Sequence, residues 1–484
     1  MSTLKRFLKN TVIYGIAAVL PKAINVALVK FHTLYLSNEE YSSNTHFYVW
    51  IAYLNVILTY GMETSFFRFF NKEKEKGKVV STSFLTILST SIIALLLLLL
   101  FKNEISNFIG FSKPIYFELL IWISVLDALV AIPFAYLRVT NRPIRYTAIR
   151  ILNICIYAFF NILFIWYIPT AIKKGYFLPE FIASNYDASF KEGYIFIANL
   201  IASAVTFIVL LPIIFQFKIS FDRRIIKNML SYSWPILVAG LAYITNENLD
   251  KLIIKSIMGD FEMGAYAAAY KIGVIMSLFI FAFKLGAEPF FFNYASKDNA
   301  KEAYAIIMKW FTIAGSLLML FVMLYLDIIA PLLLGKNTFF QLLNIVPIVL
   351  LALLFSGIYN NLSIWYKLTD KTKYGMYFSI IGALITISLL FILVPIVGSI
   401  AAAWTTLAAY GSMTVISYLY SRKHYLIPYK IKDILFYILF SVALIIAYDY
   451  FVTDNLWIAT VFLLVYLGVL FIKEKKELRK ILKR

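Results

Sequence analysis

Charged and amide side chains interrupt otherwise apolar segments at a few places in this sequence. An ionisable residue inside a bilayer costs at least about 2.5–3.5 kcal/mol, so it is expected to face a cavity or a partner. Lysine and arginine bind phosphate groups by charge and hydrogen bonds, which predicts a polar, partly cationic cleft for an anionic cargo. The residues that predict it are Lys22, Asn25 and Lys30; Glu63 and Arg68; Glu247, Asp250, Lys251 and Lys255; and Lys284 and Glu288.

The acidic residues of this set have more than one possible role. Glu63, Glu247, Asp250 and Glu288 would keep a cationic cleft from trapping an anion, and they could carry a coupling proton or sodium ion. Residues 247, 251 and 255 follow one another at intervals of four, so Glu247 and Lys251 could instead form a structural ion pair.

The polar residues near the predicted membrane surfaces, and the two asparagines, also have two possible roles. Lys30 and Lys255 lie near the predicted outer membrane surface and Arg68 near the inner one, so they could extend towards these surfaces without binding anything. Asn360 and Asn361, within SGIYNNLSIWYK, are either further site residues or interhelical hydrogen-bonding groups.

Composition excludes a soluble protein and gives no sign of an enzyme. The chain has 62% hydrophobic and 15% charged residues, whereas soluble proteins carry about 25% charged residues. Its one cysteine excludes a disulfide scaffold, and its three histidines lie on separate segments. We find no nucleophile–base arrangement, phosphate-cradling glycine loop or ATP-binding domain in the sequence, and therefore expect a transporter without a metal or cofactor.

The elements that must position these residues are membrane-spanning helices, each needing about 20 mostly apolar residues. Residues 91–101, SIIALLLLLLF, are the clearest block. We predict an all-α integral membrane fold with 14 spans, at residues 11–36, 46–70, 79–101, 115–137, 146–168, 194–215, 233–257, 264–292, 304–326, 341–366, 374–394, 398–420, 431–450 and 456–472.

Loop charge fixes the expected orientation. With the N-terminus placed in the cytoplasm, the inside segments hold 29 lysine and arginine residues and the outside loops hold six. Basic residues impede translocation of short loops, so both termini are expected to be cytoplasmic.

The spans divide into two similar halves. We predict a six-helix lobe at residues 1–215, a basic amphipathic cytoplasmic linker at 216–232, a second six-helix lobe at 233–420, and two extra helices with a basic tail at 431–484. GMETSFF at 61–67 and GAEPFFF at 286–292 are separated by 225 residues. Both copies end the second helix of their half, which indicates parallel repeats; the alternative is a chance match in a biased sequence.

The sequence resembles a family of membrane transporters. GMETSFFRFF (61–70), SYSWPILVAGLAYITNENLDKLII (231–254) and GAYAAAYKIGVIMSLFIFAFKLGAEPFFF (264–292) are similar to oligosaccharide flippases. These form the polysaccharide-export branch of the multidrug/oligosaccharidyl-lipid/polysaccharide exporter superfamily. The resemblance covers the first twelve helices and implies two six-helix lobes that form a V and alternate between inward- and outward-facing states.

The resemblance also implies a cargo and a location. The expected function is to turn a polyprenyl-pyrophosphate-linked oligosaccharide from the cytoplasmic to the outer leaflet of a bacterial inner membrane. Its expected partners are the lipid-linked oligosaccharide, a polysaccharide polymerase and glycosyltransferases, with no nucleic acid.

The sequence departs from the family pattern at two places. Family members often carry an Asp-Arg pair in helix seven, where this chain has Asp250-Lys251, and lysine lacks the bidentate geometry of arginine. The two extra helices resemble a pair in lipid II flippases, where the pair forms a groove suited to a lipid tail.

Two alternatives remain open at this stage. A cation-coupled multidrug exporter of the same superfamily would require a net-acidic cleft. A membrane polysaccharide polymerase or ligase would typically need a substantial catalytic outside loop, whereas the longest outside loop here is residues 169–193.

Overall fold

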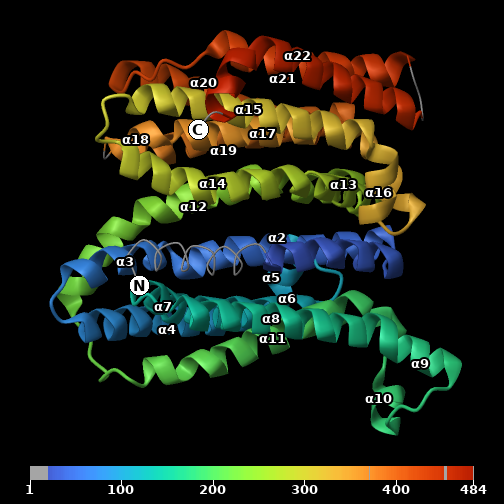
Figure 1. Cartoon of the computed structure of the whole chain (residues 1–484). Coiled ribbons are helices and arrows are strands. Elements are labelled where there is room, and N and C mark those ends of the chain that lie inside the picture. The colour runs from blue at the N-terminus through green and yellow to red at the C-terminus, as the bar shows by residue number, and fades with distance from the viewer. Residues whose placement is uncertain (1–19, 370, 452–454, 483–484) are drawn as a thin grey trace. The chain divides into compact units, whose positions relative to one another are not determined.

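The structure, a computed structural model, describes residues 20–369, 371–451 and 455–482. Its regular elements are all helices within these ranges (Figure 1). The chain divides into two compact units, each with most of its contacts within itself. Unit 1 is Met1–Ala267 and unit 2 is Ala268–Arg484.

Unit 1 begins with a helix over residues 20–35, the described part of the first predicted span. Its further helices are α2 (Asn38–Thr59), α3 (Met62–Lys72), α4 (Lys76–Leu100), α5 (Lys102–Ile109), α6 (Pro114–Leu129), α7 (Ala131–Val139), α8 (Pro143–Ile162), η1 (Leu163–Tyr167), α9 (Ile168–Lys174), α10 (Glu180–Asn185), η2 (Ala188–Phe190), α11 (Lys191–Ile214) and α12 (Arg223–Met258). The next helix, α13 (Asp260–Ile272), starts in this unit.

The second predicted span is a broken helix. Tyr60 and Gly61, between α2 and α3, have positive φ angles of 33° and 74°, and glycine takes that conformation without steric cost. A Cβ atom on Gly61 would lie 2.8 Å from Ile236 Cβ and 2.9 Å from the Ser233 carbonyl oxygen. The glycine therefore both breaks the helix and lets α12 pack against the break.

Residues 216–232 are predicted to form a separate linker on the membrane surface, and the structure differs from this prediction. The Asp222 carboxylate accepts hydrogen bonds from the backbone amides of Arg224 and Ile225 and so caps α12. Those amides hold the pKa of Asp222 below its usual value. Because α12 then runs for 36 residues without interruption, residues 223–232 are its first turns. The two units divide after Ala267, within α13.

Aromatic and aliphatic side chains form the core of unit 1. Phe47 of α2 stacks on Phe196 of α11, with 3.6 Å between ring centroids. At the other end of the unit, Phe134, Leu137 and Leu210 form a cluster that joins α7 to α11. In a membrane, where lipid tails are as apolar as these side chains, such contacts stabilise the unit through van der Waals packing.

Unit 2 contains the rest of α13 and the last predicted spans. Its helices are α14 (Val274–Tyr294), α15 (Ala300–Leu324), α16 (Leu326–Leu333), η3 (Asn337–Phe340), η4 (Leu343–Ile345), α17 (Val346–Leu362), α18 (Ile364–Leu368), α19 (Lys373–Val397), α20 (Ser399–His424), α21 (Ile431–Phe451) and α22 (Leu456–Leu482). The helices α17, α19 and α20 pack together, and α15 packs against α17, α21 and α22.

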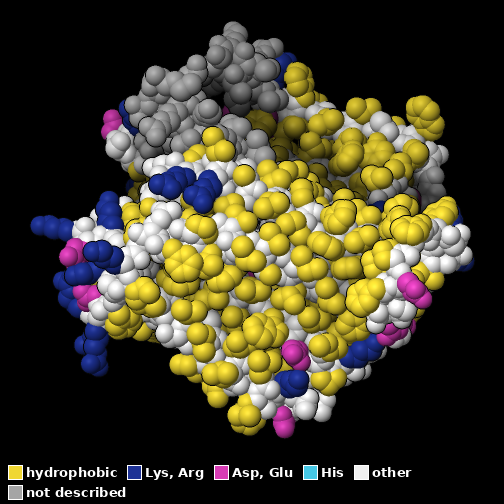
Figure 2. Space-filling model, turned by 90° about the horizontal axis from the view of Figure 1, so that it is seen from below, with side chains coloured by type: hydrophobic (Ala, Val, Ile, Leu, Met, Phe, Trp, Pro, Cys, Tyr) yellow, Lys and Arg dark blue, Asp and Glu magenta, His cyan; other side chains and the backbone are white. Residues whose placement is uncertain are grey.

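The chain is a multi-pass integral membrane protein. Among the described residues, 11 helices are long and apolar enough to cross a membrane, and they coincide with eleven of the 14 predicted spans. The other three predicted spans are 11–36, which starts outside the described residues, the broken 46–70, and 233–257, which carries the polar cluster of α12. Figure 2 shows one face covered by apolar side chains, with lysine and arginine gathered towards its edge.

Candidate functional site

Four of the predicted site residues line one pocket in unit 2. Lys284 and Glu288 come from α14, and Asn360 and Asn361 come from α17. The pocket encloses about 340 Å³ of space that is partly open to the outside. Its lining is Ile280, Phe283, Lys284, Ala287, Glu288, Phe291, Gly357, Asn360, Asn361, Ser363, Ile364 and Lys367. In the predicted orientation, it lies at the cytoplasmic ends of α14 and α17.

An ion pair joins two walls of this pocket. The Lys367 ammonium of α18 lies 2.5 Å from Glu288 Oε1 of α14, and both side chains are partly exposed. Lys284 lies one turn before Glu288 on α14 and is exposed. Two lysines and one glutamate give this pocket a formal charge of +1, which suits an anion.

Amide groups supply the uncharged polar part of the pocket. The amide nitrogens of Asn360 and Asn361 donate to the carbonyl oxygens of Ser356 and Gly357, at 3.0 and 3.2 Å. The Asn361 Oδ1 atom is buried and has no hydrogen-bond partner among the described residues. A buried acceptor without a donor is costly, whereas the partly exposed Asn360 lies where a ligand in the pocket can reach it.

Close helix packing shapes the pocket from behind. A Cβ atom on Gly357 would lie 2.5 Å from Phe311 Cζ and 3.0 Å from Ile280 Cγ1. The absent side chain therefore lets α14 and α15 approach α17 at the level of the pocket.

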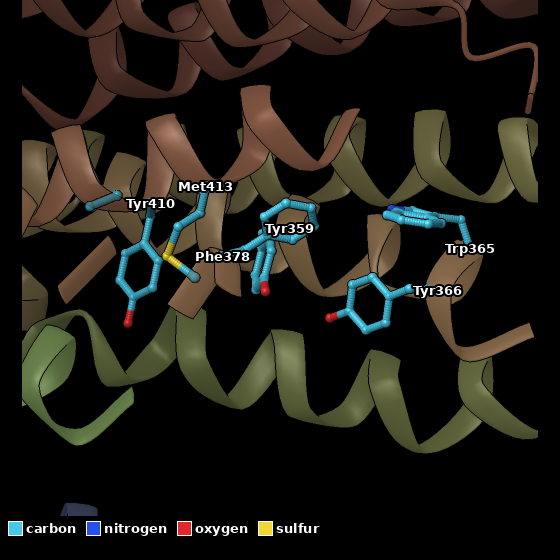
Figure 3. Close-up of a cluster of buried hydrophobic side chains, with 7 residues drawn as sticks. Tyr359, Trp365, Tyr366, Phe378, Tyr410 and Met413 are labelled. Carbon is cyan, nitrogen blue, oxygen red and sulfur yellow. The ribbon is translucent and has the colours of Figure 1, made fainter. Parts of the chain in front are cut away.

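An aromatic cluster holds α18 in place. Trp365 has no exposed surface and donates from Nε1 to Ser417 Oγ of α20, at 3.3 Å. Figure 3 shows Trp365 and Tyr366 of α18 in a row with Tyr359, Phe378, Tyr410 and Met413. Because Lys367 follows these buried rings directly, its backbone position is fixed beside the pocket.

The polar residues of α12 form a separate group in unit 1. Asp250 and Lys251 are buried and paired, with 2.8 Å between Oδ1 and Nζ. The Tyr266 hydroxyl donates to Asp250 Oδ2 at 2.9 Å, and the Lys251 ammonium also donates to the Glu247 carbonyl oxygen at 2.7 Å. This geometry satisfies the charges of Asp250 and Lys251 within unit 1, in keeping with a structural role as well as with binding.

The end of α12 is tied to α2. The Lys255 ammonium pairs with the Asp260 carboxylate at the start of α13. The same Asp260 Oδ1 atom accepts a hydrogen bond from Ser42 Oγ at 2.6 Å. Lys255 is therefore engaged in a contact that fastens the turn between α12 and α13.

The two predicted residues of α3 have partners at the predicted cytoplasmic end of unit 1. Glu63 Oε1 lies 2.6 Å from a guanidinium nitrogen of Arg138, which ends α7. The Arg68 guanidinium lies over the Tyr232 ring at 4.4 Å. Both contacts leave the charged groups near the surface of the unit.

The remaining predicted residues of unit 1 have interactions of their own or lie exposed. Lys22 and Lys30 are half-buried in the helix over residues 20–35, and Asn25 is exposed. Both lysines and Glu247 make contacts within the structure. The pocket of unit 2 and this set of residues belong to different units, so the predicted single cleft stays a prediction.

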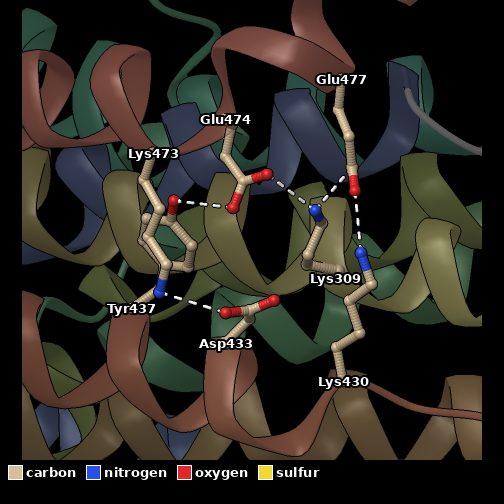
Figure 4. Close-up of polar contacts among 7 residues, drawn as sticks. All are labelled: Lys309, Lys430, Asp433, Tyr437, Lys473, Glu474 and Glu477. Carbon is tan, nitrogen blue, oxygen red and sulfur yellow. Dashed lines mark hydrogen bonds and ion pairs between the residues drawn. The ribbon is translucent and has the colours of Figure 1, made fainter.

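A second ionic network joins the two extra helices to the rest of unit 2. Lys309 of α15 is 1% exposed and lies 2.8 Å from Glu474 Oε2 and 2.5 Å from Glu477 Oε2 of α22. Figure 4 shows Lys430 on Glu477, Tyr437 on Glu474, and the neighbouring pair of Lys473 and Asp433. Three lysines and three carboxylates balance, so the network holds α21 and α22 against α15 without net charge.

An apolar groove runs beside this network. It encloses about 670 Å³, open to the outside, between α14, α15 and α22. All of its side chains are apolar: Phe279, Ala314, Leu317, Leu318, Phe321, Leu463 and Leu467. An uncharged hydrocarbon chain is the ligand class that such a lining suits.

Sequence reasoning missed Lys367 and the pairing of Lys309. Lys367 falls just after the predicted span 341–366, although residues 360, 364 and 367 have the spacing of one helical face, which links it to Asn360. The sequence gives no sign that Lys309 is paired. Its partner Glu474 is 165 residues away, and no periodicity in one sequence reveals such a contact.

Comparison with known proteins shows which proteins have a similar fold. Residues 188–284, which include α11 and α12, match the model of a family described as polysaccharide biosynthesis protein. No curated protein sequence matches the chain. A structure of the lipid II flippase MurJ in an inward closed conformation has a TM-score of 0.69 at 18% identity, covering 96% of this chain and all of that one.

Drug transporters have the same fold. An inward-facing multidrug resistance transporter of the MATE family has a TM-score of 0.67 at 14% identity, covering 86% of this chain and 97% of that one. A transporter of the same superfamily from Pyrococcus furiosus has a TM-score of 0.60 at 13% identity, covering 86% and 95%. The resemblance inferred from the sequence is confirmed at the level of the fold: this chain has the fold of these transporters, and its residues 188–284 match the family model described as polysaccharide biosynthesis protein.

Proposed function

We propose that this protein translocates a polyprenyl-pyrophosphate-linked oligosaccharide from the cytoplasmic to the outer leaflet of a bacterial inner membrane by alternating access, for surface polysaccharide biosynthesis. The observation that carries the proposal is the unit 2 pocket, where Lys284 and Lys367 lie with the amides of Asn360 and Asn361. Lysines and amides are the groups that recognise a diphosphate and the sugar hydroxyls next to it.

The sign of the pocket charge separates this function from its main alternative. A multidrug exporter that takes organic cations needs a pocket of net negative charge, since an opposite charge stabilises the bound ligand. The ionisable residues of this pocket are two lysines and one glutamate. The resulting positive charge favours the diphosphate of a lipid-linked sugar over a cationic drug.

The ion pair in the pocket gives the diphosphate a binding mechanism. In this structure, Glu288 neutralises Lys367. A diphosphate carries more charge than a carboxylate, so it can take the place of Glu288 and bind Lys367 together with Lys284. The partly exposed amide of Asn360 can then hydrogen-bond a hydroxyl of the first sugar.

The apolar groove gives the polyprenyl chain a place to lie. Phe279 lines the groove, and the adjacent residue Ile280 lines the pocket, so one helix, α14, contributes to both. The head of the substrate and the start of its hydrocarbon tail would therefore bind on two sides of α14. The oligosaccharide would extend beyond the pocket.

Flipping measured in proteoliposomes tests the proposal. The substrate is a polyprenyl-diphosphate oligosaccharide with a fluorescent sugar, and its arrival in the far leaflet is read with an impermeant quencher. Lys284→Gln is expected to lower flipping roughly tenfold or more, because a hydrogen bond to a charged group contributes about 1.5–3 kcal/mol. Lys297→Gln, a loss of charge at an exposed turn after α14, is the matched control and should leave flipping unchanged.

Equal flipping by the Lys284→Gln variant and the wild-type protein would remove the pocket from the proposal. Transport of a cationic drug by the same vesicles, without diphosphate flipping, would favour the exporter alternative instead.

A further inference from the structure

The segment between α8 and α11 presents exposed aromatic side chains that the transport site does not use. Phe177 is 90% exposed and Phe181 is 78% exposed, and Tyr176 and Ile182 are also exposed. The short helix α10 has no buried residue at all. Figure 1 shows α9 and α10 projecting from the end of α8, away from the other helices of unit 1.

This segment continues directly from a long membrane span. The helical run Pro143–Lys174 has 32 residues, which corresponds to about 48 Å at 1.5 Å per residue. The hydrocarbon core of a bilayer is about 30 Å thick, so the last turns of the run extend into the headgroup layer. Exposed Trp166 and Tyr167 lie on this run, and aromatic residues of these types gather at membrane interfaces.

Both ends of the projecting segment are fixed, so its aromatic side chains are held in one place. Gly175 ends α9 in the left-handed conformation, with φ of 69°, and its amide donates to the Ala171 carbonyl oxygen. At the other end, the Asp187 amide donates to the Tyr194 hydroxyl at 2.8 Å. The ring of Tyr186 stacks on the same Tyr194, with 5.0 Å between centroids.

Charge marks the two borders of the segment, and one exposed carboxylate, Glu180, lies within it at the start of α10. Lys173 and Lys174 end α9 and are exposed, next to Phe177. Hydrogen bonds from the Ser189 amide and hydroxyl hold the pKa of Asp187 below its usual value, so this residue stays ionised. Lysines suit the phosphates of lipid headgroups, and a fixed carboxylate at the far end suits water.

We propose that the α9–α10 segment is an interfacial anchor, in which Phe177 and Phe181 insert into the headgroup layer of the outer leaflet while Lys173 and Lys174 contact lipid phosphates. The occupant of this surface is the bilayer that the chain already crosses. Phe177 lies just before α10 and Phe181 lies on it, with both lysines on the N-terminal side. Exposed aromatic residues beside basic residues are typical of a segment that lies on a membrane. The anchor holds the outer end of α8 at a constant depth while cargo moves.

Single-cysteine labelling of the full chain tests the anchor. The only cysteine is first removed with Cys155→Ser. Phe177→Cys and Phe181→Cys are then each labelled with an environment-sensitive fluorophore, so that the other phenylalanine remains in each variant. Two controls bracket the result: Asp298→Cys in an exposed turn, and Leu97→Cys on the exposed face of α4.

The labelled proteins are reconstituted at low density into vesicles of phosphatidylcholine and phosphatidylglycerol. The labels at 177 and 181 should emit at shorter wavelength than the label at 298. A quencher attached near the lipid headgroup should quench them at least twofold more strongly than it quenches that label, and aqueous iodide should quench them less.

Labels at 177 and 181 that behave like the label at 298 would overturn the proposal. The proposal would also be overturned if the labels were protected from iodide only at high protein density. The surface would then be covered by another copy of the protein and not by the bilayer.

Discussion

Glu288 and Lys367 form an ion pair between α14 and α18, with 2.5 Å between Oε1 and Nζ. Glu63 and Arg138 form the corresponding pair in unit 1, at 2.6 Å. Each glutamate is the third residue of its Gly-x-Glu copy, and each basic residue directly follows the fourth predicted span of its half. The recurrence of this contact supports the interpretation that the two halves are parallel repeats.

The glycines of the two copies differ in their surroundings. In unit 1 a Cβ atom on Gly61 would meet α12, whereas a Cβ atom on Gly286 of unit 2 would have no atom within 4 Å. The space beside the motif is thus filled in the first half and open in the second. The pocket that we assign to the cargo occurs in the half where that space is open.

Neutralising the two partners of the pocket ion pair in separate variants shows whether the pair serves substrate binding or only the stability of the fold. Lys367→Gln should weaken diphosphate binding roughly tenfold or more, since a charged hydrogen bond is lost. Glu288→Gln should not weaken it, because the variant keeps Lys367 and removes its competitor. Binding is measured by titrating the purified protein with a short-chain polyprenyl diphosphate. The same loss in both variants would show that the pair matters only for the fold.

The two motif glycines should respond oppositely to substitution by alanine. Gly61→Ala should destabilise the protein by about 1–3 kcal/mol, since it adds a Cβ atom to a left-handed residue packed against α12. Gly286→Ala should be neutral or stabilising by up to about 1 kcal/mol, because it lies within a helix and has open space. Thermal unfolding in detergent measures both, and equal destabilisation would contradict the difference between the two copies.

Removing the buried lysine of α15 should loosen the two extra helices. Lys309→Met leaves Glu474 and Glu477 without their shared cation, and breaking a buried ion pair costs about 3–5 kcal/mol. Lys301→Met removes an exposed charge from the same helix and should change stability by less than about 0.5 kcal/mol. Thermal unfolding and proteolysis near residues 425–430 report the effect. A stable, protease-resistant Lys309→Met variant would contradict the role of this network.

The same network predicts a pH dependence. Burial alone would raise the pKa of Glu477, but hydrogen bonds from Lys309 and Lys430 hold it below its ordinary value of 4.5. A lowered carboxyl pKa contributes stability that is present above the ordinary value and is lost as pH falls through the folded-state value. Glu477→Gln should therefore lower the Tm at neutral pH, and the difference from the wild-type protein should shrink below about pH 4.5.

Measuring the Tm of both proteins from about pH 3 to 8 checks this sign. A difference that grows on acidification would contradict it.

Apolar blocks were sufficient to predict most of the spans, because the bilayer imposes a length on each helix. The span at residues 233–257 is the instructive exception. Its apolar pattern predicted a helix correctly, but Asn246, Glu247, Asp250 and Lys251 make α12 too polar to be recognised by hydropathy alone. Such a helix depends on partners like Tyr266, which a single sequence does not reveal.

The candidate site was predictable only in part for the same physical reason. Lys284, Glu288, Asn360 and Asn361 were recognised because charges and amides are rare inside spans. Their grouping in one pocket depends on the packing of α14 against α17, and the presence of Lys367 depends on the contact of α18 with α14. Contacts between helices far apart in the sequence set both features.

Substrate choice in proteoliposomes tests the central claim most directly. Vesicles that contain the wild-type protein are given, in turn, a fluorescent polyprenyl-diphosphate oligosaccharide, the same lipid with a monophosphate, and a cationic drug. We predict that the diphosphate lipid is flipped at least about tenfold faster than in protein-free vesicles, and that Lys284→Gln combined with Lys367→Gln abolishes this gain. Movement of the cationic drug without flipping of the diphosphate lipid would contradict the account.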